Sequence, residues 1–384
     1  MSLLDVAPTY IRAIAPYQAG KPISEVAREY GLDEAQIVKL ASNENPLGMS
    51  PQAQQAMQAA MHDLGRYPDA NGFALKALIS QQTAVPESWI TLGNGSNDIL
   101  ELAARAVLSP GRAAVYAQHA FAVYPLATQA TGAECIEVPA LTSGTNRFGH
   151  DLPAMLRTIK NNPHTHLVFI ANPNNPTGTF IPAAELAAFL AAVPPTVIVV
   201  LDEAYTEYLP PELRFDTVAW VRQYPNLIVS RTLSKAYGLA GLRIGYALAQ
   251  PEITDLLNRV RQPFNVNALA QAAALAALQD QAFLAQSYAL NQAGLQAVGA
   301  GLAALGLPYI RSYANFILFD VDSLAAGAAN AGAQVYQALL KRGIIVRPVA
   351  NYGLPQWLRV SIGLPEENSR FLAALAEIAQ GAGQ

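Results

Sequence analysis

Residues 197–205 read Val-Ile-Val-Val-Leu-Asp-Glu-Ala-Tyr, a run of five apolar residues that ends in an acidic pair. A continuous apolar run of this length predicts a β-strand covered on both faces, because a half-exposed strand would alternate apolar and polar residues. Similar runs occur at residues 167–171 and 227–230, and a polar loop and a helix-compatible stretch follow each of them. The alternation predicts an α/β fold with a doubly wound, mainly parallel sheet.

The chain on either side of these runs continues the same pattern. Upstream, residues 89–92 predict a strand, residues 93–98 a glycine-rich loop and residues 99–108 a helix. Downstream, residues 244–249 predict a further strand. The sheet therefore draws its strands from a long, continuous part of the chain.

The last third of the chain has a different composition. Ala, Leu and Gln dominate residues 268–305, which predicts long helices. Beyond them the pattern predicts strand, helix, strand and strand, in the order 315–320, 334–340, 344–347 and 357–362. We therefore expect a large domain of residues 41–282 and a small α+β domain of residues 1–40 and 283–384.

The composition excludes several classes of protein. Of the 384 residues, 52% are hydrophobic and only 14% are charged, which predicts a folded core rather than a disordered chain. A net charge of −4 without long charged runs disfavours nucleic acid and anionic membranes as partners. No apolar run approaches the roughly 18 residues of a membrane span. With one cysteine, Cys135, and no signal-peptide pattern near the start, we expect a cytoplasmic protein.

Polar residues follow directly on several predicted strands. Ligands of open α/β sheets bind at the carboxyl ends of the strands, so these residues are candidates for a site. Asp202 ends an apolar strand and needs a cation or several donors, although a helix N-cap or a structural ion pair would also explain it. Lys235 suits a covalent role or a plain solvated surface position. The loop Gly-Asn-Gly-Ser-Asn at 93–97 suits phosphate binding at a helix start, or a plain tight turn.

Together these residue types match the needs of one cofactor. Pyridoxal 5'-phosphate needs a lysine amine for covalent attachment and a carboxylate that keeps its ring nitrogen protonated. It also needs a donor near its phenolic oxygen and a cup for its phosphate. The chain contains neither the G-x-x-x-x-G-K-[ST] motif of NTPases nor G-x-G-x-x-G. The sequence therefore indicates a pyridoxal-phosphate enzyme.

Three spaced motifs make the chain resemble the fold-type I aminotransferases. They are Asn-Pro-Asn-Asn-Pro-Thr-Gly at 172–178, Asp-Glu-Ala-Tyr at 202–205 and Ser-Lys-Ala-Tyr-Gly-Leu-Ala-Gly-Leu-Arg at 234–243. Further motifs resemble the histidinol-phosphate aminotransferases, which are class II members: Lys-Leu-Ala-Ser-Asn-Glu-Asn-Pro-Leu-Gly at 39–48, Arg-Tyr-Pro-Asp at 66–69, Arg-Pro-Val-Ala-Asn-Tyr-Gly at 347–353 and Leu-Arg-Val-Ser-Ile-Gly at 358–363. The resemblance covers nearly the whole chain.

The resemblance implies how the cofactor is held. It makes Lys235 the lysine that carries pyridoxal phosphate covalently and Asp202 the partner of the ring nitrogen. The other implied cofactor contacts are the phenolic-oxygen donors Asn175 and Tyr205, the phosphate cup of Gly95, Ser96, Asn97, Thr232, Ser234 and Arg243, and the stacked ring of Phe121. It also implies that Tyr67 reaches the phosphate of the neighbouring subunit, which would make the protein a homodimer.

Two arginines and two N-terminal residues are the candidates for substrate binding. Arg347 and Arg359 lie in predicted strands, where a guanidinium needs an anion or a structural ion pair. The resemblance implies that Arg359 grips the carboxylate of glutamate or the phosphate of the other substrate, with Arg347 assisting on the phosphate. Tyr17 and Asn43 match positions near the substrate, although packing or capping would also explain them.

The resemblance implies that the protein converts histidinol phosphate and 2-oxoglutarate to imidazole acetol phosphate and glutamate, a reaction of histidine biosynthesis. Three alternatives stay open: an aromatic amino-acid aminotransferase, a lyase similar to threonine-phosphate decarboxylase, and a non-catalytic sensing module. The sensing module normally accompanies a DNA-binding domain, for which this chain has no basic segment. We expect no metal ion, because the close histidine pair His164 and His166 lies in a polar loop without further ligands.

Overall fold

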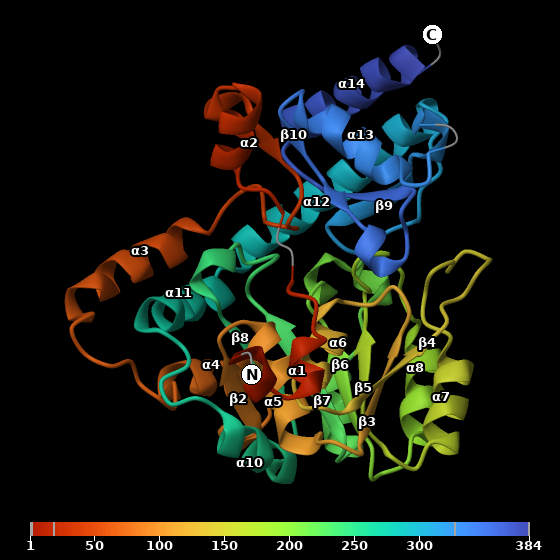
Figure 1. Cartoon of the computed structure of the whole chain (residues 1–384). Helices are drawn as coiled ribbons and strands as arrows, with labels where there is room; N and C mark the ends of the chain where they lie inside the picture. The colour runs from red at the N-terminus through yellow and green to blue at the C-terminus, as the bar shows by residue number, and fades with distance from the viewer. Residues whose placement is uncertain (1–2, 18–19, 326–327, 383–384) are drawn as a thin grey trace.

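The computed structural model describes residues 3–17, 20–325 and 328–382. A seven-stranded sheet in the order β2-β8-β7-β6-β5-β3-β4 forms the centre of the larger part of the molecule (Figure 1). Its strands are β2 Ile90–Gly93, β3 Ala113–Ala117, β4 Glu134–Val138, β5 Thr165–Ala171, β6 Ile198–Asp202, β7 Leu227–Thr232 and β8 Gly245–Leu248. β8 runs antiparallel to both of its neighbours, and the other pairs are parallel. The predicted α/β fold is confirmed.

Two strands of this sheet were not predicted. β3 reads Ala-Ala-Val-Tyr-Ala, and alanine has a low preference for strands. It is nevertheless buried throughout, because it lies between β4 and β5 in the sheet. β4 occupies the edge and carries two glutamates in five residues. Both strands are held in place by pairing with their neighbours in the sheet.

Helices cover both faces of the sheet (Figure 1). α5 packs on β2, β7 and β8, while α6 and α7 pack on β3 and β4. The helices are α1 Thr9–Arg12, α2 Ile23–Tyr30, α3 Pro51–Ala60, α4 Phe73–Thr83, α5 Ser96–Val107, α6 Val123–Gln129, α7 Leu152–Asn161, α8 Ala183–Ala192, α9 Thr217–Gln223, α10 Pro251–Val260, α11 Ala268–Gln279, α12 Gln281–Ala304, α13 Ala331–Leu340 and α14 Pro365–Ala382. The predicted helical tract is thus two helices, and Asp280 caps the second by accepting a hydrogen bond from the Phe283 backbone at 3.1 Å.

The smaller part of the molecule contains two short sheets. One is the three-stranded sheet β11-β12-β9, formed by Arg347–Pro348, Trp357–Ser361 and Phe316–Asp320. In the other, β1 Val38–Lys39 pairs in parallel with β10 Ile344–Ile345. The single strand predicted at 344–347 was therefore wrong, since its two halves belong to different sheets.

Buried side chains form two principal clusters. The larger extends from Ala53 to Leu278 along the sequence and fills the space between the seven-stranded sheet and its helices. The second combines Val38 and Leu40 with residues from Val298 to Leu375. An N-terminal segment thus packs with the C-terminal part of the chain, and the carboxyl ends of β5, β6 and β7 lie next to this second cluster's sheet.

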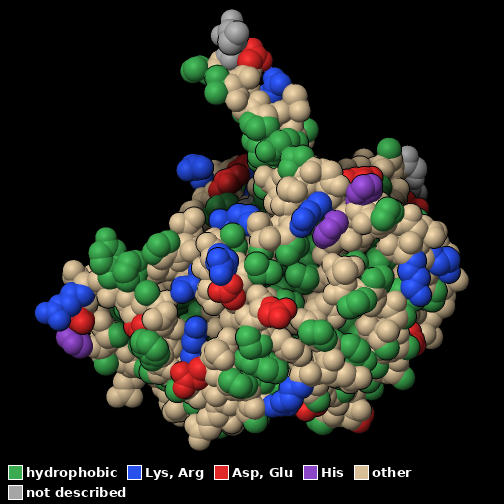
Figure 2. All heavy atoms as spheres, turned by 90° about the horizontal axis from the view of Figure 1, so that it is seen from below, with side chains coloured by type: hydrophobic (Ala, Val, Ile, Leu, Met, Phe, Trp, Pro, Cys, Tyr) green, Lys and Arg blue, Asp and Glu red, His purple; other side chains and the backbone are tan. Residues whose placement is uncertain are grey.

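The first described residues of the chain, before α2, form an arm that projects from the body of the molecule (Figure 2). Leu3, Leu4 and Val6 on this arm are exposed, with 90%, 69% and 79% of their surfaces accessible. Within the described ranges, no helix is both long enough and apolar enough to span a membrane.

Candidate active site

A cavity of about 320 Å³ lies where the two parts of the molecule meet, at the carboxyl ends of the parallel strands. Most of the predicted site residues line it, although they come from widely separated parts of the sequence. They are Tyr17, Asn43, Ser96, Asn97, Phe121, Asn175, Asp202, Tyr205, Thr232, Ser234, Lys235, Arg243, Arg347 and Arg359. Gly95 and Tyr67 are the two predicted residues outside this lining.

Asp202 is the last residue of β6 and is only 5% exposed. Its Oδ2 accepts a hydrogen bond from the Tyr124 hydroxyl at 2.9 Å, whereas its Oδ1 has no hydrogen-bond partner. Burial raises the pKa of this carboxyl to about 6, although the Tyr124 hydrogen bond acts in the opposite direction. At neutral pH the group is an anion with one oxygen available to a cationic N–H.

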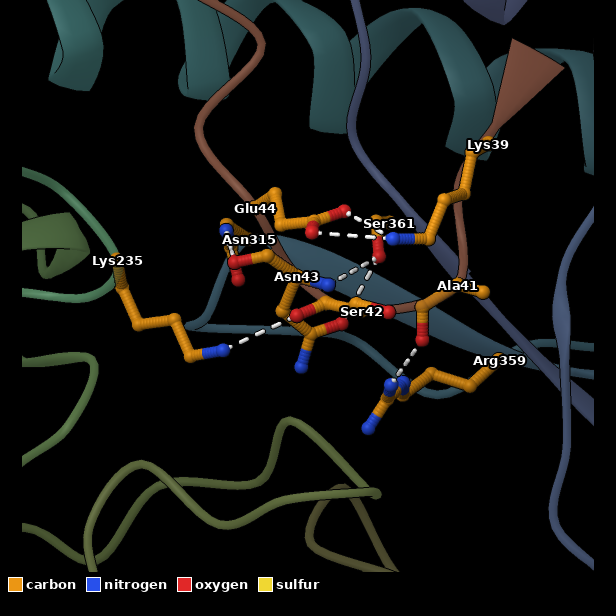
Figure 3. Close-up of polar contacts among 9 residues, drawn as sticks. All are labelled: Lys39, Ala41, Ser42, Asn43, Glu44, Lys235, Asn315, Arg359 and Ser361. Atoms are coloured by element: carbon orange, nitrogen blue, oxygen red, sulfur yellow. Dashed lines mark hydrogen bonds and ion pairs between the residues drawn. The ribbon is translucent and has the colours of Figure 1, made fainter. Parts of the chain in front are cut away.

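Lys235 follows β7 and projects toward the N-terminal segment (Figure 3). Its Nζ donates a hydrogen bond to the Ser42 carbonyl at 3.0 Å. Burial, together with the neighbouring Arg359 guanidinium, lowers the pKa of Lys235 to about 8. Because the neutral amine is the nucleophilic form, this environment activates Lys235 near neutral pH.

Asn43 connects the two parts of the molecule through a buried hydrogen-bond network. Its Nδ2 donates to the Tyr205 hydroxyl at 2.9 Å, and its backbone N–H donates to Ser361 Oγ at 2.9 Å. Its carbonyl accepts from Asn315 Nδ2 at 3.0 Å (Figure 3). Asn43 also adopts a left-handed backbone conformation with φ of 55°, which asparagine tolerates better than most residues. The network fixes the Tyr205 hydroxyl at the cavity wall.

The predicted phosphate cup lies at the start of α5. The first turn of this helix has no side-chain cap, so its N–H groups and the helix dipole favour an anion there. Arg243 approaches from the loop after β7, and its guanidinium donates to Ser234 Oγ at 3.4 Å. Gly95 has φ of 81°, and a Cβ at this position would lie 2.5 Å from Arg243 Nη2. The absence of a side chain at Gly95 thus leaves space for the Arg243 guanidinium beside the start of α5.

Arg359 and Arg347 face each other on adjacent strands, as register partners of β12 and β11. Arg359 is buried and donates hydrogen bonds to Asn175 Oδ1 and to the Ala41 carbonyl, the latter at 2.7 Å. Its Nε has no partner. The Arg347 guanidinium lies 5.5 Å from the ring centroid of Tyr17, a cation–π distance. Two cations and an aromatic ring therefore form one end of the cavity.

Tyr67 lies away from the cavity lining. It is 82% exposed and stacks on Phe264, with 4.6 Å between the ring centroids. Phe121, by contrast, lines the cavity and packs edge-to-face against Tyr124 at 5.9 Å.

Three contributions were missed from the sequence. Tyr124 binds Asp202, Tyr352 lines the cavity, and Ser42 contacts Lys235 through its backbone carbonyl. Tyr124 left a signal, because it is an aromatic residue close in sequence to the predicted site residue Phe121. A backbone carbonyl leaves no signal in a sequence.

The chain belongs to the aminotransferase class I and II family, whose model matches residues 35–375. The predicted family resemblance is therefore confirmed. In the part of the chain that the structure describes, no three His, Cys, Asp or Glu side chains are grouped to hold a metal ion.

Sequence similarity to individual members of the family extends over nearly the whole chain. It is 64% identical over 372 residues to histidinol-phosphate aminotransferase 2 of Ralstonia nicotianae, covering 97% of this chain and 96% of the relative. It is 59% identical over 376 residues to histidinol-phosphate aminotransferase of Methylobacillus flagellatus, covering 98% of each chain.

Solved structures of aminotransferases also have folds similar to that of this chain. Histidinol-phosphate aminotransferase from Sinorhizobium meliloti, solved in complex with pyridoxal-5'-phosphate, has a TM-score of 0.86 at 28% identity over 97% of both chains. Aspartate aminotransferase from Thermus thermophilus, solved with maleate, has a TM-score of 0.81 at 22% identity, covering 97% of this chain and 99% of that one. The latter likeness establishes the shared fold.

Proposed function

We propose that this protein is a pyridoxal-phosphate-dependent histidinol-phosphate aminotransferase. It would convert histidinol phosphate and 2-oxoglutarate to imidazole acetol phosphate and glutamate, in the biosynthesis of histidine. The names of relatives at 59–64% identity over nearly the whole chain support the substrate. The arrangement of charged groups in the cavity supports the chemistry.

The observation that carries the proposal is the unpartnered Oδ1 of Asp202. A buried carboxylate oxygen without a hydrogen bond is costly unless a ligand binds it. A protonated pyridine nitrogen satisfies this oxygen with a charge-assisted hydrogen bond. The same cavity contains an activated lysine and an uncapped helix start beside Arg243, so the residues fit pyridoxal phosphate at both ends.

The chain's own residues would then divide the chemistry among them. Pyridoxal phosphate, when bound, supplies an electron sink for the breaking of the substrate Cα–H bond. Asp202 holds a proton at the ring nitrogen, because its pKa of about 6 keeps it anionic at neutral pH. Lys235 would hold the cofactor covalently and, as the free amine, would accept the proton that leaves the substrate Cα. Tyr205 and Asn175 would supply donors to the phenolic oxygen.

The two arginines would select the substrate. A phosphate monoester has three acceptor oxygens and close to two negative charges, so it suits two guanidinium groups better than a carboxylate does. Arg359 would bind the anion of either substrate, and Arg347 would assist on the phosphate. Tyr17, stacked on Arg347, and Asn43 would contact the rest of the substrate.

Assembly, domain division and location belong to the same proposal. We propose a homodimer in which Tyr67 reaches the neighbour's phosphate site, and the exposed Tyr67–Phe264 pair and the apolar N-terminal arm support it. The domain boundaries proposed from the sequence, 41–282 against 1–40 with 283–384, are supported by the two separate core clusters. Cytoplasmic location stays a prediction from composition.

The test is a comparison of catalytic efficiencies. The purified protein is assayed with histidinol phosphate, phenylalanine and threonine phosphate, each with 2-oxoglutarate as acceptor. We expect the highest kcat/KM for histidinol phosphate. Preference for phenylalanine would support the aromatic aminotransferase instead, and release of CO₂ from threonine phosphate would support the lyase.

A further inference from the structure

We propose that Tyr124 is a positioning residue for the reaction, which holds Asp202 so that its Oδ1 faces the cofactor. The inference rests on the proposed function and assigns a role to a residue outside the family motifs named above. The Tyr124 hydroxyl donates to Asp202 Oδ2 at 2.9 Å, and Oδ1 stays without a partner. Occupying one oxygen leaves the carboxylate a single direction in which to accept another hydrogen bond.

The position of the Tyr124 ring is fixed by its neighbours. Tyr124 is fully buried and belongs to α6. Its ring lies nearly parallel to that of Phe169 on β5, with 4.7 Å between centroids and 4° between planes. Phe121 packs against it edge-to-face at 5.9 Å. Because both contacts involve the ring alone, replacing tyrosine by phenylalanine removes the hydroxyl without removing the packing.

Tyr124 always acts as a donor to Asp202. Burial and the Asp202 charge both raise the pKa of Tyr124 well above its ordinary value, so the hydroxyl keeps its proton at any pH of interest. Two other charged groups shift the pKa of Asp202. Glu203, which forms an ion pair with Arg231 at 2.9 Å, raises this pKa, and Lys235 in the cavity lowers it. The Ala204 backbone N–H also lowers the pKa of the Asp202 carboxyl.

The hydroxyl has a chemical consequence as well as a geometric one. A hydrogen bond to a carboxylate stabilises its anion, so Tyr124 makes Asp202 less basic than it would otherwise be. Without this hydrogen bond, Asp202 binds a proton more readily and holds it on its own oxygen. Asp202 is then a weaker partner for a protonated ring nitrogen.

The first test follows the protonation of Asp202 in the full chain freed of cofactor. Infrared spectra of wild type minus Asp202→Asn isolate the C=O stretching band of the protonated Asp202 carboxyl. The same difference is taken for Tyr124→Phe against Tyr124→Phe with Asp202→Asn. We expect Tyr124→Phe to raise the midpoint of this band by about one pH unit, the size expected for one hydrogen bond to a charged group. An unchanged midpoint overturns the proposal.

The second test uses the cofactor-loaded enzyme and a double-mutant cycle in the glutamate half-reaction. Tyr124→Phe should lower the rate by about tenfold in the wild type. Tyr124→Phe should lower the rate by less than about twofold when Asp202 is already asparagine, because a residue that acts through Asp202 has no effect once Asp202 is replaced. Equal reductions in both backgrounds would mean a merely structural role and would overturn the proposal.

Tyr116→Phe is the matched control. Tyr116 is also a buried tyrosine, but it lies on β3 and its hydroxyl interacts with Cys135 outside the cavity. We expect neither the infrared midpoint nor the rate to change in this variant. The infrared test needs no substrate, so a failure to accept histidinol phosphate would refute the proposed function without affecting this result.

Discussion

Asp202→Asn should make the cofactor-free protein less sensitive to pH while abolishing most of the activity of the loaded enzyme. In the folded chain, burial raises the pKa of Asp202 from its ordinary value of 3.8 to about 6. Between these two values the folded state binds more protons than the unfolded state does. The free energy of unfolding therefore falls as the pH rises through this range. Asparagine does not titrate, so this loss disappears in the variant.

The magnitude follows from the size of the shift. About two pKa units, at about 1.4 kcal/mol each, correspond to about 3 kcal/mol of stability lost over the whole range. Between pH 5 and pH 8 the loss is about 1.4 kcal/mol, because part of the titration takes place below pH 5. The side-chain amide also leaves a buried group without a partner, at a cost of roughly 1–3 kcal/mol that does not vary with pH.

The measurement is urea unfolding of both cofactor-free proteins at pH 5 and pH 8, with a check that the m-values agree. The stability of Asp202→Asn relative to wild type should increase by about 1.4 kcal/mol from pH 5 to pH 8. Lys235 and the other titrating groups occur in both proteins, so their contributions cancel to first order. Parallel stability profiles would show that Asp202 is not a buried, shifted carboxyl. Near-normal turnover of the loaded variant would remove its role at the ring nitrogen.

Three further predictions concern the rest of the site. Arg359→Ala should reduce kcat/KM for both histidinol phosphate and glutamate, whereas Arg347→Ala should reduce kcat/KM more for histidinol phosphate than for glutamate. Each lost charged contact should reduce kcat/KM by roughly 30- to 1,000-fold. Equal losses for both substrates in Arg347→Ala would contradict the phosphate assignment. Gly95→Ala should weaken pyridoxal-phosphate binding about tenfold or more, because its Cβ displaces Arg243, whereas Gly241→Ala, with open space around its Cβ, should bind normally in the same spectroscopic titration. Inactive Lys235→Ala and Tyr67→Ala subunits, once exchanged into hybrid dimers, should regain part of the activity, and no recovery after demonstrated exchange would count against a shared site.

The central strands and the polar residues at their ends could be predicted from sequence for a physical reason. β5, β6 and β7 are buried on both faces, which requires the continuous apolar runs seen at 167–171, 197–201 and 227–230. Ligands bind at the carboxyl ends of such strands, so the polar residues that follow were recognisable as a site. The seven-stranded sheet confirms the predicted strands, and the cavity at their carboxyl ends is lined by the polar residues that follow them.

The remaining features depend on contacts that the local sequence does not encode. β3 is an alanine-rich strand that the sheet imposes from both sides, and the segment 344–347 divides between two sheets because two different partners meet it. The hydrogen bond between Lys235 and the Ser42 carbonyl joins residues 193 positions apart through a backbone atom. Contacts of this kind become visible only once the chain is folded.

The charges in the cavity indicate which ligands it favours. Lys235, Arg243, Arg347 and Arg359 line the cavity together with Asp202 as its acidic group. Positive charges in proximity destabilise one another, and Arg359 contributes to the lowered pKa of Lys235. The cavity therefore favours ligands with several negative charges, which matches a cofactor phosphate and a phosphorylated substrate bound at its two ends. Asp202 is hydrogen-bonded to Tyr124, and its Oδ1 remains available to a cationic ring nitrogen.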